Sequence, residues 1–404
     1  MRKTIVSVVV AAACLAAFGA AGAAGEIQLK VTPQADGANV PVSAAVTLPA
    51  DLAGAQPDQI TVAMKSATGQ SVPGQVVQCP ACGTKVCWIA PALKAGQAQT
   101  WTATLTKGRY AGKDAYTFQD TAGKHLDLLC GGKLVTRYMY ERDTSDKTRN
   151  FDTGKVYTHA FNELGSDTIT KGTGGQYPHH RGIFLGYKVT YDGKKSGDWW
   201  HVRNVAQEHQ KTLRTAAGPV LAASTVLIHW NDGAGKTVVA EERTTIVYRQ
   251  PDPTLLLLDF RSKLTPVASD VVFGGDPEHA GMQFRPHNDV NRKTMQYLFP
   301  DEAITTKNVL KHDDLPWAAE CYELKGKKYS VEHMNHPDNP KGTKYSAYRD
   351  YGRFGAYGKT EAKKDEPLLL SYRIWAATGE MPPRQELDQR SKAFATPPKV
   401  EVVK

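Results

Sequence analysis

The stretch Ala222–Leu264, AASTVLIHWNDGAGKTVVAEERTTIVYRQPDPTLLLLDFRSKL, decides the predicted fold. It contains three segments rich in β-branched, aromatic and leucine residues, separated by turn sequences at 231–233 (NDG) and 251–253 (PDP). Leu255–Leu258 could be helical by residue type, but the bracketing prolines and the β-rich neighbours favour a buried strand. The stretch therefore predicts a meander of long antiparallel strands.

The same pattern extends in both directions along the chain. Residues 191–193 (YDG) indicate a further hairpin, and only Glu386–Phe394 has a helical period. Between Ile27 and Leu105, short alternating segments are broken by proline and glycine, which is typical of a small β-sandwich. We therefore expect an all-β protein, with a large antiparallel β-sandwich after a small N-terminal β-sandwich lead-in.

The first residues have the layout of an export signal. Arg2 and Lys3 precede a short apolar segment, and the small residues at 21–23 (AGA) fit a cleavage site. The apolar segment is shorter than the about 20 residues of a membrane-spanning helix, and Cys14 lies in a poor lipidation motif. We therefore expect a periplasmic or secreted protein. The expected divisions are a signal peptide at 1–23, the β lead-in at 24–141 and the main sandwich, with the active cleft, at 142–404.

Composition and missing motifs exclude several classes of protein. The net charge is +9, but the basic residues are scattered, which argues against nucleic acid and favours an anionic glycan as partner. No second apolar segment is long enough to span a membrane. The chain lacks a G-x-S-x-G elbow, a phosphate-binding glycine loop, an H-E-x-x-H motif and a dinucleotide fingerprint. We therefore expect no cofactor, and the sequence does not indicate the oligomeric state.

Three cysteines, Cys79, Cys82 and Cys87, lie close together in a polar segment rich in turn residues. Disulfides form readily outside the cytoplasm, and a fourth zinc ligand would have to come from a distant segment. We therefore predict one local disulfide among these three cysteines rather than a metal site.

Histidines gather in the middle of the chain and define the predicted site region. The sequence has 12 histidines, and none occurs before His125. They fall in clusters together with aromatic and basic residues, namely YTH at 157–159, YPHHRG at 177–182, DWWH at 198–201 and EHAGMQFRPH at 278–287.

The PHHRG motif is expected to open a strand. Adjacent side chains of a strand point to opposite faces, so only one of His179 and His180 should line a pocket. A histidine titrates near neutral pH and the arginine fork matches a carboxylate, which together suit proton abstraction beside a uronate carboxylate. Alternatively, both histidines only cap the strand by hydrogen bonds to backbone. The predicted catalytic residues are His159, His180, Arg181, Tyr157, Tyr177, His279 and Arg285.

Further residues are candidates for holding a substrate. An indole face can stack on a sugar ring, although buried tryptophans are as common in sandwich cores. Glu241 and Glu242 are adjacent on one strand, so one of them should face inward, as an acid or as an ion-pair partner of an arginine. The predicted substrate-binding residues are His179, Trp199, Trp200, His201 and Glu242, and no metal ligand is assigned.

Four segments resemble a secreted bacterial family once labelled methane-oxygenase-like (PmoA-like) and now treated as of unknown function. They are 177–186 (YPHHRGIFLG), 197–201 (GDWWH), 276–285 (DPEHAGMQFR) and 348–355 (YRDYGRFG). The old label is set aside, because a membrane methane oxygenase needs spanning helices and this chain has none. The resemblance covers roughly Asp51 to the C-terminus, and the chain departs from the pattern at Cys79–Cys87 and Lys171–Gln176. It implies a fold similar to galactose mutarotases and polysaccharide lyases, and no agreed catalytic residues.

Three functions are consistent with these residues. The first is a carbohydrate-active enzyme, with lyase chemistry on a uronic acid favoured; His180 or His159 would remove the proton, Arg181 or Arg285 would neutralise the carboxylate, and Tyr157 or Tyr177 would protonate the leaving oxygen. The second is a non-catalytic glycan-binding protein with a platform of Trp199, Trp200 and Arg181. The third is a metal-dependent enzyme using His159, His179 and His279.

Overall fold

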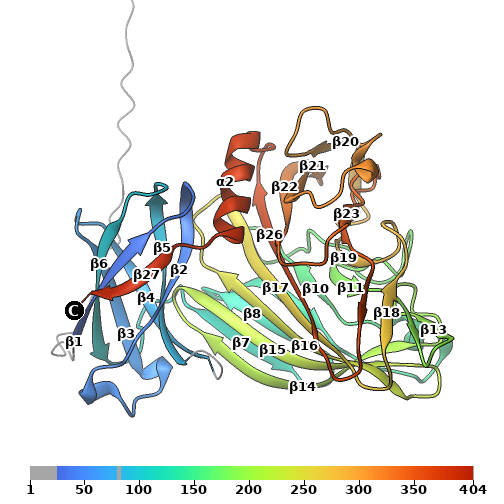
Figure 1. The fold of residues 1–404 in the computed structure, drawn as a ribbon, viewed down its shortest axis with the longest axis horizontal. Helices are drawn as coiled ribbons and strands as arrows, with labels where there is room; N and C mark the ends of the chain where they lie inside the picture. Colours follow the sequence, from blue (N-terminus) through green and yellow to red (C-terminus); the bar gives the residue numbers. More distant parts are fainter. Residues whose placement is uncertain (1–24, 80–82, 404) are drawn as a thin grey trace, which may run out of the picture.

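The computed structural model describes residues 25–79 and 83–403, and in this part of the chain most elements are β-strands (Figure 1). The prediction of an all-β fold is confirmed. The expected signal peptide at 1–23 lies outside the described residues, so export stays a prediction. None of the helices in the described ranges combines the length and apolarity that a membrane crossing needs.

The N-terminal strands form a seven-stranded antiparallel sheet with its own core (blue in Figure 1). Trp88 and Trp101 are fully buried in this core, with ring centroids 6.1 Å apart. The last strand comes from the C-terminus, so the two ends of the described chain meet in one sheet. In sheet order the strands are β2 (Gly37–Ala45), β5 (Gly83–Leu93), β4 (Ser71–Cys79), β3 (Ile60–Ser66), β6 (Gln99–Lys107), β1 (Gly25–Thr32) and β27 (Lys399–Val403), and two short 3-10 helices, η1 (Ala50–Leu52) and η2 (Pro57–Gln59), precede β3.

The main body is a sandwich of two eight-stranded antiparallel sheets. One large apolar core joins residues of both sheets, for example Phe284 of the first and Trp230 and Phe260 of the second. The first sheet contains, in order, β23 (Lys344–Tyr345), β24 (Phe354–Tyr357), β19 (Gly281–Phe284), β11 (Ile183–Gly186), β10 (Tyr157–Ala160), β9 (Lys133–Met139), β8 (His125–Cys130) and β7 (Tyr116–Thr121). The second contains β14 (Ala206–Ala217), β15 (Leu221–Asn231), β16 (Thr237–Tyr248), β17 (Thr254–Pro266), β26 (Leu368–Thr378), β22 (Lys327–Asn335), β21 (Trp317–Leu324) and β20 (Val290–Leu298).

Smaller elements lie around the sandwich. A four-stranded sheet is built from β13 (Lys195–Asp198), β12 (Lys188–Tyr191), β18 (Val271–Gly274) and β25 (Thr360–Ala362). The helical segments are α1 (Lys147–Asp152), η3 (Val309–Lys311) and α2 (Arg384–Ala395). Helix α2, predicted from the period of Glu386–Phe394, packs Leu387 and Phe394 onto Trp375 of β26 and carries the chain back to β27.

The local sequence signals agree with the strands. The meander at 222–264 forms β15, β16 and β17, and the leucine run is a buried strand rather than a helix. At the β12–β13 turn, Asp192 and Gly193 both have positive φ, 46° and 73°, as a type I′ hairpin requires. The pattern was less informative about partners: β7 to β9 lie before residue 141, yet β9 pairs with β10 in the main sandwich. Alternation identifies a strand but not the strand beside it.

The cysteine cluster is partly described. Cys79 is disulfide-bonded, whereas Cys87 is a free, buried thiol whose pKa is raised to about 12 by burial. Cys82 lies outside the described residues. The predicted disulfide therefore includes Cys79 and leaves out Cys87.

The adjacent acids of β16 differ as strand alternation predicts. Glu241 is fully buried and accepts hydrogen bonds from Arg243, from the Trp230 indole at 2.9 Å and from Ser262 at 2.8 Å. Glu242 is exposed and pairs with Lys263 at 2.8 Å, away from the site described below. The structure therefore gives Glu242 no role in binding a substrate.

We expect Glu241→Gln to destabilise the sandwich by about 3–5 kcal/mol, because it leaves the Arg243 charge buried without its counter-charge. Glu242→Gln is the matched control and should change the free energy of unfolding by less than about 0.5 kcal/mol. Urea unfolding followed by tryptophan fluorescence measures both. Equal stabilities of the two variants would contradict this account of the buried pair.

Candidate functional site

A cavity of about 380 Å³ opens among the loops of the main sandwich. Its walls come from α1 and from the loops before β11, after β13, before β19 and before β24. Four of its side chains are histidines, which is a third of the histidines in the whole sequence. The lining residues are Phe151, Tyr177, His179, His180, His201, Val202, Arg203, Glu278, His279 and Tyr351.

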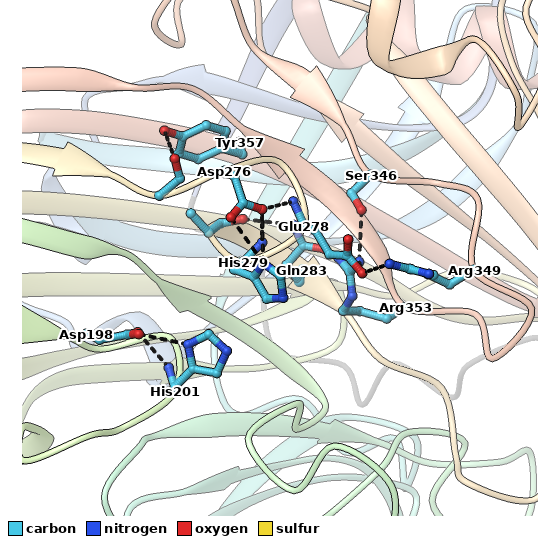
Figure 2. Close-up of polar contacts among 12 residues, drawn as sticks. Asp198, His201, Asp276, Glu278, His279, Gln283, Ser346, Arg349, Arg353 and Tyr357 are labelled. Atoms are coloured by element: carbon cyan, nitrogen blue, oxygen red, sulfur yellow. Dashed lines mark hydrogen bonds and ion pairs between the residues drawn. The ribbon is translucent and has the colours of Figure 1, made fainter.

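Two of these histidines are held by aspartates in the same way, on separate loops (Figure 2). His201 Nδ1 lies 2.8 Å from Asp198 Oδ2, and His279 Nδ1 lies 3.0 Å from Asp276 Oδ1. In both loops the aspartate also accepts the backbone N–H of its histidine, at 2.9 Å for His201 and 3.0 Å for His279. Each carboxylate thus fixes the ring through Nδ1 and leaves the Nε2 edge for a ligand.

The two aspartates were not among the predicted site residues. A recurring D-x-x-H spacing, at 198–201 and again at 276–279, is the signal that would have identified them. Burial acts to raise the pKa of Asp198, but the hydrogen bonds from His201 hold the pKa of this carboxyl below its usual value. Asp198 is therefore in its ionised form where it orients His201.

His179 and His180 both line the cavity, so the prediction that only one of them could do so is wrong. They lie in the loop before β11, where side chains do not alternate as they do in a strand. Their ring centroids are 4.3 Å apart, and His179 lies 4.5 Å from His201. Burial, together with the nearby Lys155, lowers the pKa of His179 to about 2, and burial places the pKa of His180 well below its usual value. Both rings are therefore neutral at pH 7.

Arg181 does not face the cavity. Its fully buried guanidinium donates to three backbone carbonyls, those of Pro178, Asp152 and Phe151, each at 2.9 Å. Asp198 is not among the partners of its guanidinium in the described part of the chain. The predicted catalytic role of Arg181 is therefore replaced by a structural one, in which it ties α1 to the histidine loop.

Arg285 is also buried and also serves the backbone. It donates to the carbonyls of Pro286 and Tyr351 and, at 3.2 Å, to the side chain of Asn288. The expectation that it neutralises a carboxylate inside the cavity is thus not met, since it does not line the cavity.

The remaining predicted residues divide between the cavity and the core. His159 is buried with Nδ1 3.0 Å from Thr170 Oγ1, beside the buried Tyr157, and neither lines the cavity. Trp199 and Trp200 are 1% and 0% exposed, so neither offers an indole face to a sugar. Tyr177 does line the cavity and is 41% exposed. Of the predicted set, the structure brings together His179, His180, His201, His279 and Tyr177.

Two non-glycine residues of the cavity wall adopt positive φ, 52° at Tyr177 and 60° at Val202. The left-handed region is unusual for any side chain and a clear outlier for a β-branched one. Such conformations persist only where surrounding contacts impose them, and they are common at binding and catalytic sites.

An acidic group completes the wall. Glu278 accepts a hydrogen bond from Arg349, and buried Arg353 lies 4.0 Å from it (Figure 2). Glu278 also accepts a hydrogen bond from Tyr348, at 3.2 Å. Burial acts to raise the pKa of Glu278, but Arg349 holds it below its usual value. Within the described ranges, no group of three or more His, Cys, Asp or Glu side chains is arranged to hold a metal ion.

Comparison with known proteins identifies the family. Residues 125–392 match the Family of unknown function (DUF6807). The chain belongs to this family. The match spans most of the main sandwich and every loop of the cavity, whereas all seven strands of the N-terminal sheet lie outside it. A search of curated proteins finds no sequence that matches the chain.

Two solved structures are similar at low identity. One is a protein in the Glycosyl Hydrolase Family 38 from Enterococcus faecalis, with a TM-score of 0.45, 10% identity and 94% of this chain covered. The other is a polysaccharide lyase, with a TM-score of 0.29, 11% identity and 70% of this chain covered. The alignments span 47% and 34% of those longer chains. At these scores the likeness does not transfer a function to the DUF6807 chain.

The buried histidines predict loss of stability in acid. Burial lowers the pKa of His159 to about 4, whereas an unfolded histidine titrates near 6.5, so the unfolded state binds more protons between these values. Stability is therefore complete above pH 6.5 and falls as the pH drops towards 4. We expect His159→Gln to reduce the slope of the unfolding free energy against pH by up to about 1.4 kcal/mol per pH unit in this range. Urea unfolding at several pH values measures this slope. His312→Gln, in an outer loop, should leave the slope unchanged; an unchanged slope in the His159 variant would refute the assignment.

Arg181→Lys should lower the melting temperature by several degrees, because an ammonium cannot reach three carbonyls that the planar guanidinium satisfies together. Arg203→Lys, at an exposed arginine of the cavity rim, should melt within about one degree of the wild type. Differential scanning calorimetry of both variants tests this. A stable Arg181→Lys protein would show that the three hydrogen bonds do not hold the loops.

Proposed function

We propose that this DUF6807 protein is a carbohydrate-active enzyme that cleaves a uronate-containing glycan by β-elimination outside the cytoplasm. The observation that carries the proposal is the presence of two aspartate-held histidines at one cavity. The His201 and His279 ring centroids are 5.2 Å apart, and both residues line the cavity. A ring fixed through Nδ1 presents Nε2 as a base, and two such rings can act on one bound sugar.

In this reaction the base removes the proton at C5 of the uronate, beside the carboxylate. The electron pair released from that bond forms the C4–C5 double bond, the C4–oxygen bond breaks, and the leaving oxygen takes up a proton. His279 is the more suitable base, because its side chain is 41% exposed, against 20% for His201. Asp276 then stabilises the imidazolium that forms, as a carboxylate beside a histidine does in hydrolases.

Tyr177 is the candidate for the proton donor. Its ring lines the same cavity and is the most exposed of the aromatic rings there. Tyr157, the other predicted donor, is buried against Phe184 and Trp200 and does not line the cavity. The cavity volume of about 380 Å³ falls within the range of small-ligand sites.

The two alternatives have less support. A glycan-binding platform of Trp199, Trp200 and Arg181 requires accessible faces, and all three side chains are buried. A metal site of His159, His179 and His279 requires His159 in the cavity, where it does not lie. The pairing of His201 with Asp198 and of His279 with Asp276 favours a role in proton transfer over these two alternatives.

The test is an assay on a panel of uronate-containing polysaccharides, following the ultraviolet absorbance of the unsaturated product. His279→Gln should reduce turnover by about 10²–10⁴-fold, the usual contribution of a general base. Asp276→Asn should also lower turnover, because the amide no longer stabilises a charged ring. His229→Gln, on β15 outside the cavity, is the control and should keep full turnover.

Absence of unsaturated product from every polysaccharide in the panel would refute β-elimination. Full turnover of the His279→Gln variant would instead remove this residue as the base. Both results are informative because each variant is first compared with the wild type in melting temperature, which separates lost chemistry from lost folding.

A further inference from the structure

His180 has buried ring nitrogens that no protein group satisfies. The residue is 2% exposed, and neither Nδ1 nor Nε2 has a hydrogen-bond partner among the described residues. Yet the ring contributes to the cavity wall, beneath the exposed Tyr177 ring at a centroid distance of 5.4 Å. A buried polar group without a partner costs about 1–3 kcal/mol, so a ligand that supplies the partner would bind there favourably.

The surroundings of His180 are positively charged. Lys155 is fully buried before β10, its Nζ donates to the carbonyls of His179 and Trp200, and burial together with the nearby Arg181 lowers its pKa well below the usual value. Arg285 and Arg353 are buried on the other side, and the Nε atom of each lacks a partner among the described residues. These cations, together with His179, all disfavour a proton on His180.

Few acids offset this charge. Glu278 of the β19 loop is shared between Arg349 and, at 4.0 Å, Arg353. Glu320 of β21 is close to Arg285 and Arg353, and its complete burial raises its pKa well above the usual value, against the lowering effect of these two arginines. Three arginines, Arg285, Arg349 and Arg353, therefore face two carboxyl groups, Glu278 and Glu320, which leaves positive charge in excess near a histidine that can still donate a hydrogen bond.

We propose that His180 is the floor of a carboxylate subsite that binds the acidic group of the sugar and takes up a proton when it does so. The identity of the ligand as a sugar acid rests on the function proposed above, whereas its negative charge follows from the surroundings of His180. One oxygen of the carboxylate accepts a hydrogen bond from His180, and its negative charge is stabilised at longer range by Arg285 and Arg353, which are buried near His180 but do not line the cavity.

Proton uptake follows from the charges facing the ring. In the free protein, His180 is neutral because it is buried among cations, with His179 and His201 also nearby in the cavity. A carboxylate adds the counter-charge that is missing, which favours the protonated ring. Binding of the anion should therefore strengthen as the pH falls from 8 to 5.5, by at most about tenfold per pH unit for one linked proton.

The experiment is calorimetric titration of the full chain with D-galacturonate and D-glucuronate, and with D-galactose and D-glucose as uncharged matches. Titrations in buffers of different ionisation enthalpy count the protons taken up. The protein is dialysed against EDTA beforehand, so that an added metal cannot supply the anion site. We expect the uronates to bind at least tenfold more tightly than the neutral sugars, with proton uptake at pH 6.

His180→Gln should weaken uronate binding at least tenfold and abolish proton uptake, while His229→Gln should leave both unchanged. Equal affinity of the wild type for uronates and neutral sugars, or proton release on binding, would overturn the subsite. Both quantities are measured on the wild-type protein, so the test does not depend on the stability of a variant. Uronate binding with proton uptake but without product from any polysaccharide would uphold the subsite and refute the elimination. If the His180→Gln protein still carries out the elimination and still takes up protons when it binds a uronate, the elimination would be upheld and the subsite refuted.

Discussion

Buried cations that donate to loop carbonyls are the constraint on which the site depends. The cavity walls are loops, and the carbonyl groups that these loops bury need hydrogen-bond donors. The Arg181 guanidinium donates three hydrogen bonds to such carbonyls, and Lys155 Nζ donates one to the carbonyl of His179 and one to that of Trp200. Lys171 Nζ likewise donates to the carbonyl oxygen of His180, at 3.2 Å, and to the carbonyls of Gly172 and Gly174 in the glycine-rich segment before it. The loops are therefore held by long basic side chains instead of by strand ladders.

This manner of support also determines the electrostatics of the site. Buried Arg181 brings a positive charge close to the cavity, and burial reduces the screening of that charge by water. Burial lowers the pKa of Lys171 to about 7 and that of Lys155 well below its usual value. The histidines among these cations are consequently neutral, as the pKa of about 2 for His179 indicates. A cavity with neutral His179 and His180 and with buried arginines nearby suits a negatively charged ligand. The aspartates that hold His201 and His279 keep two rings in a fixed orientation within it.

The rest of the fold serves to hold these loops in place. Strands β11, β19 and β24 are neighbours in one sheet of the sandwich, and each is preceded by a loop that lines the cavity. Their side chains are entirely buried, so the loops start from rigid strands. The N-terminal sheet is tied to the other end of the chain through β27 and α2, and it contributes no residue to the cavity.

The sequence by itself determined the strands, several turns and the region of the site. Alternation and turn residues are local properties, so the meander at 222–264, the 191–193 turn and the burial of Glu241 beside exposed Glu242 could all be predicted. Clustering of histidines likewise indicated the segments that line the cavity. The tertiary structure alone decided which neighbours each polar group has. From the sequence, Arg181 could be assigned to a substrate carboxylate. The structure shows that its guanidinium instead donates to the carbonyls of Phe151 and Asp152, which lie about thirty residues earlier in the chain. Burial and hydrogen-bond partners depend on segments distant along the chain, and no local pattern encodes which of these segments meet in space.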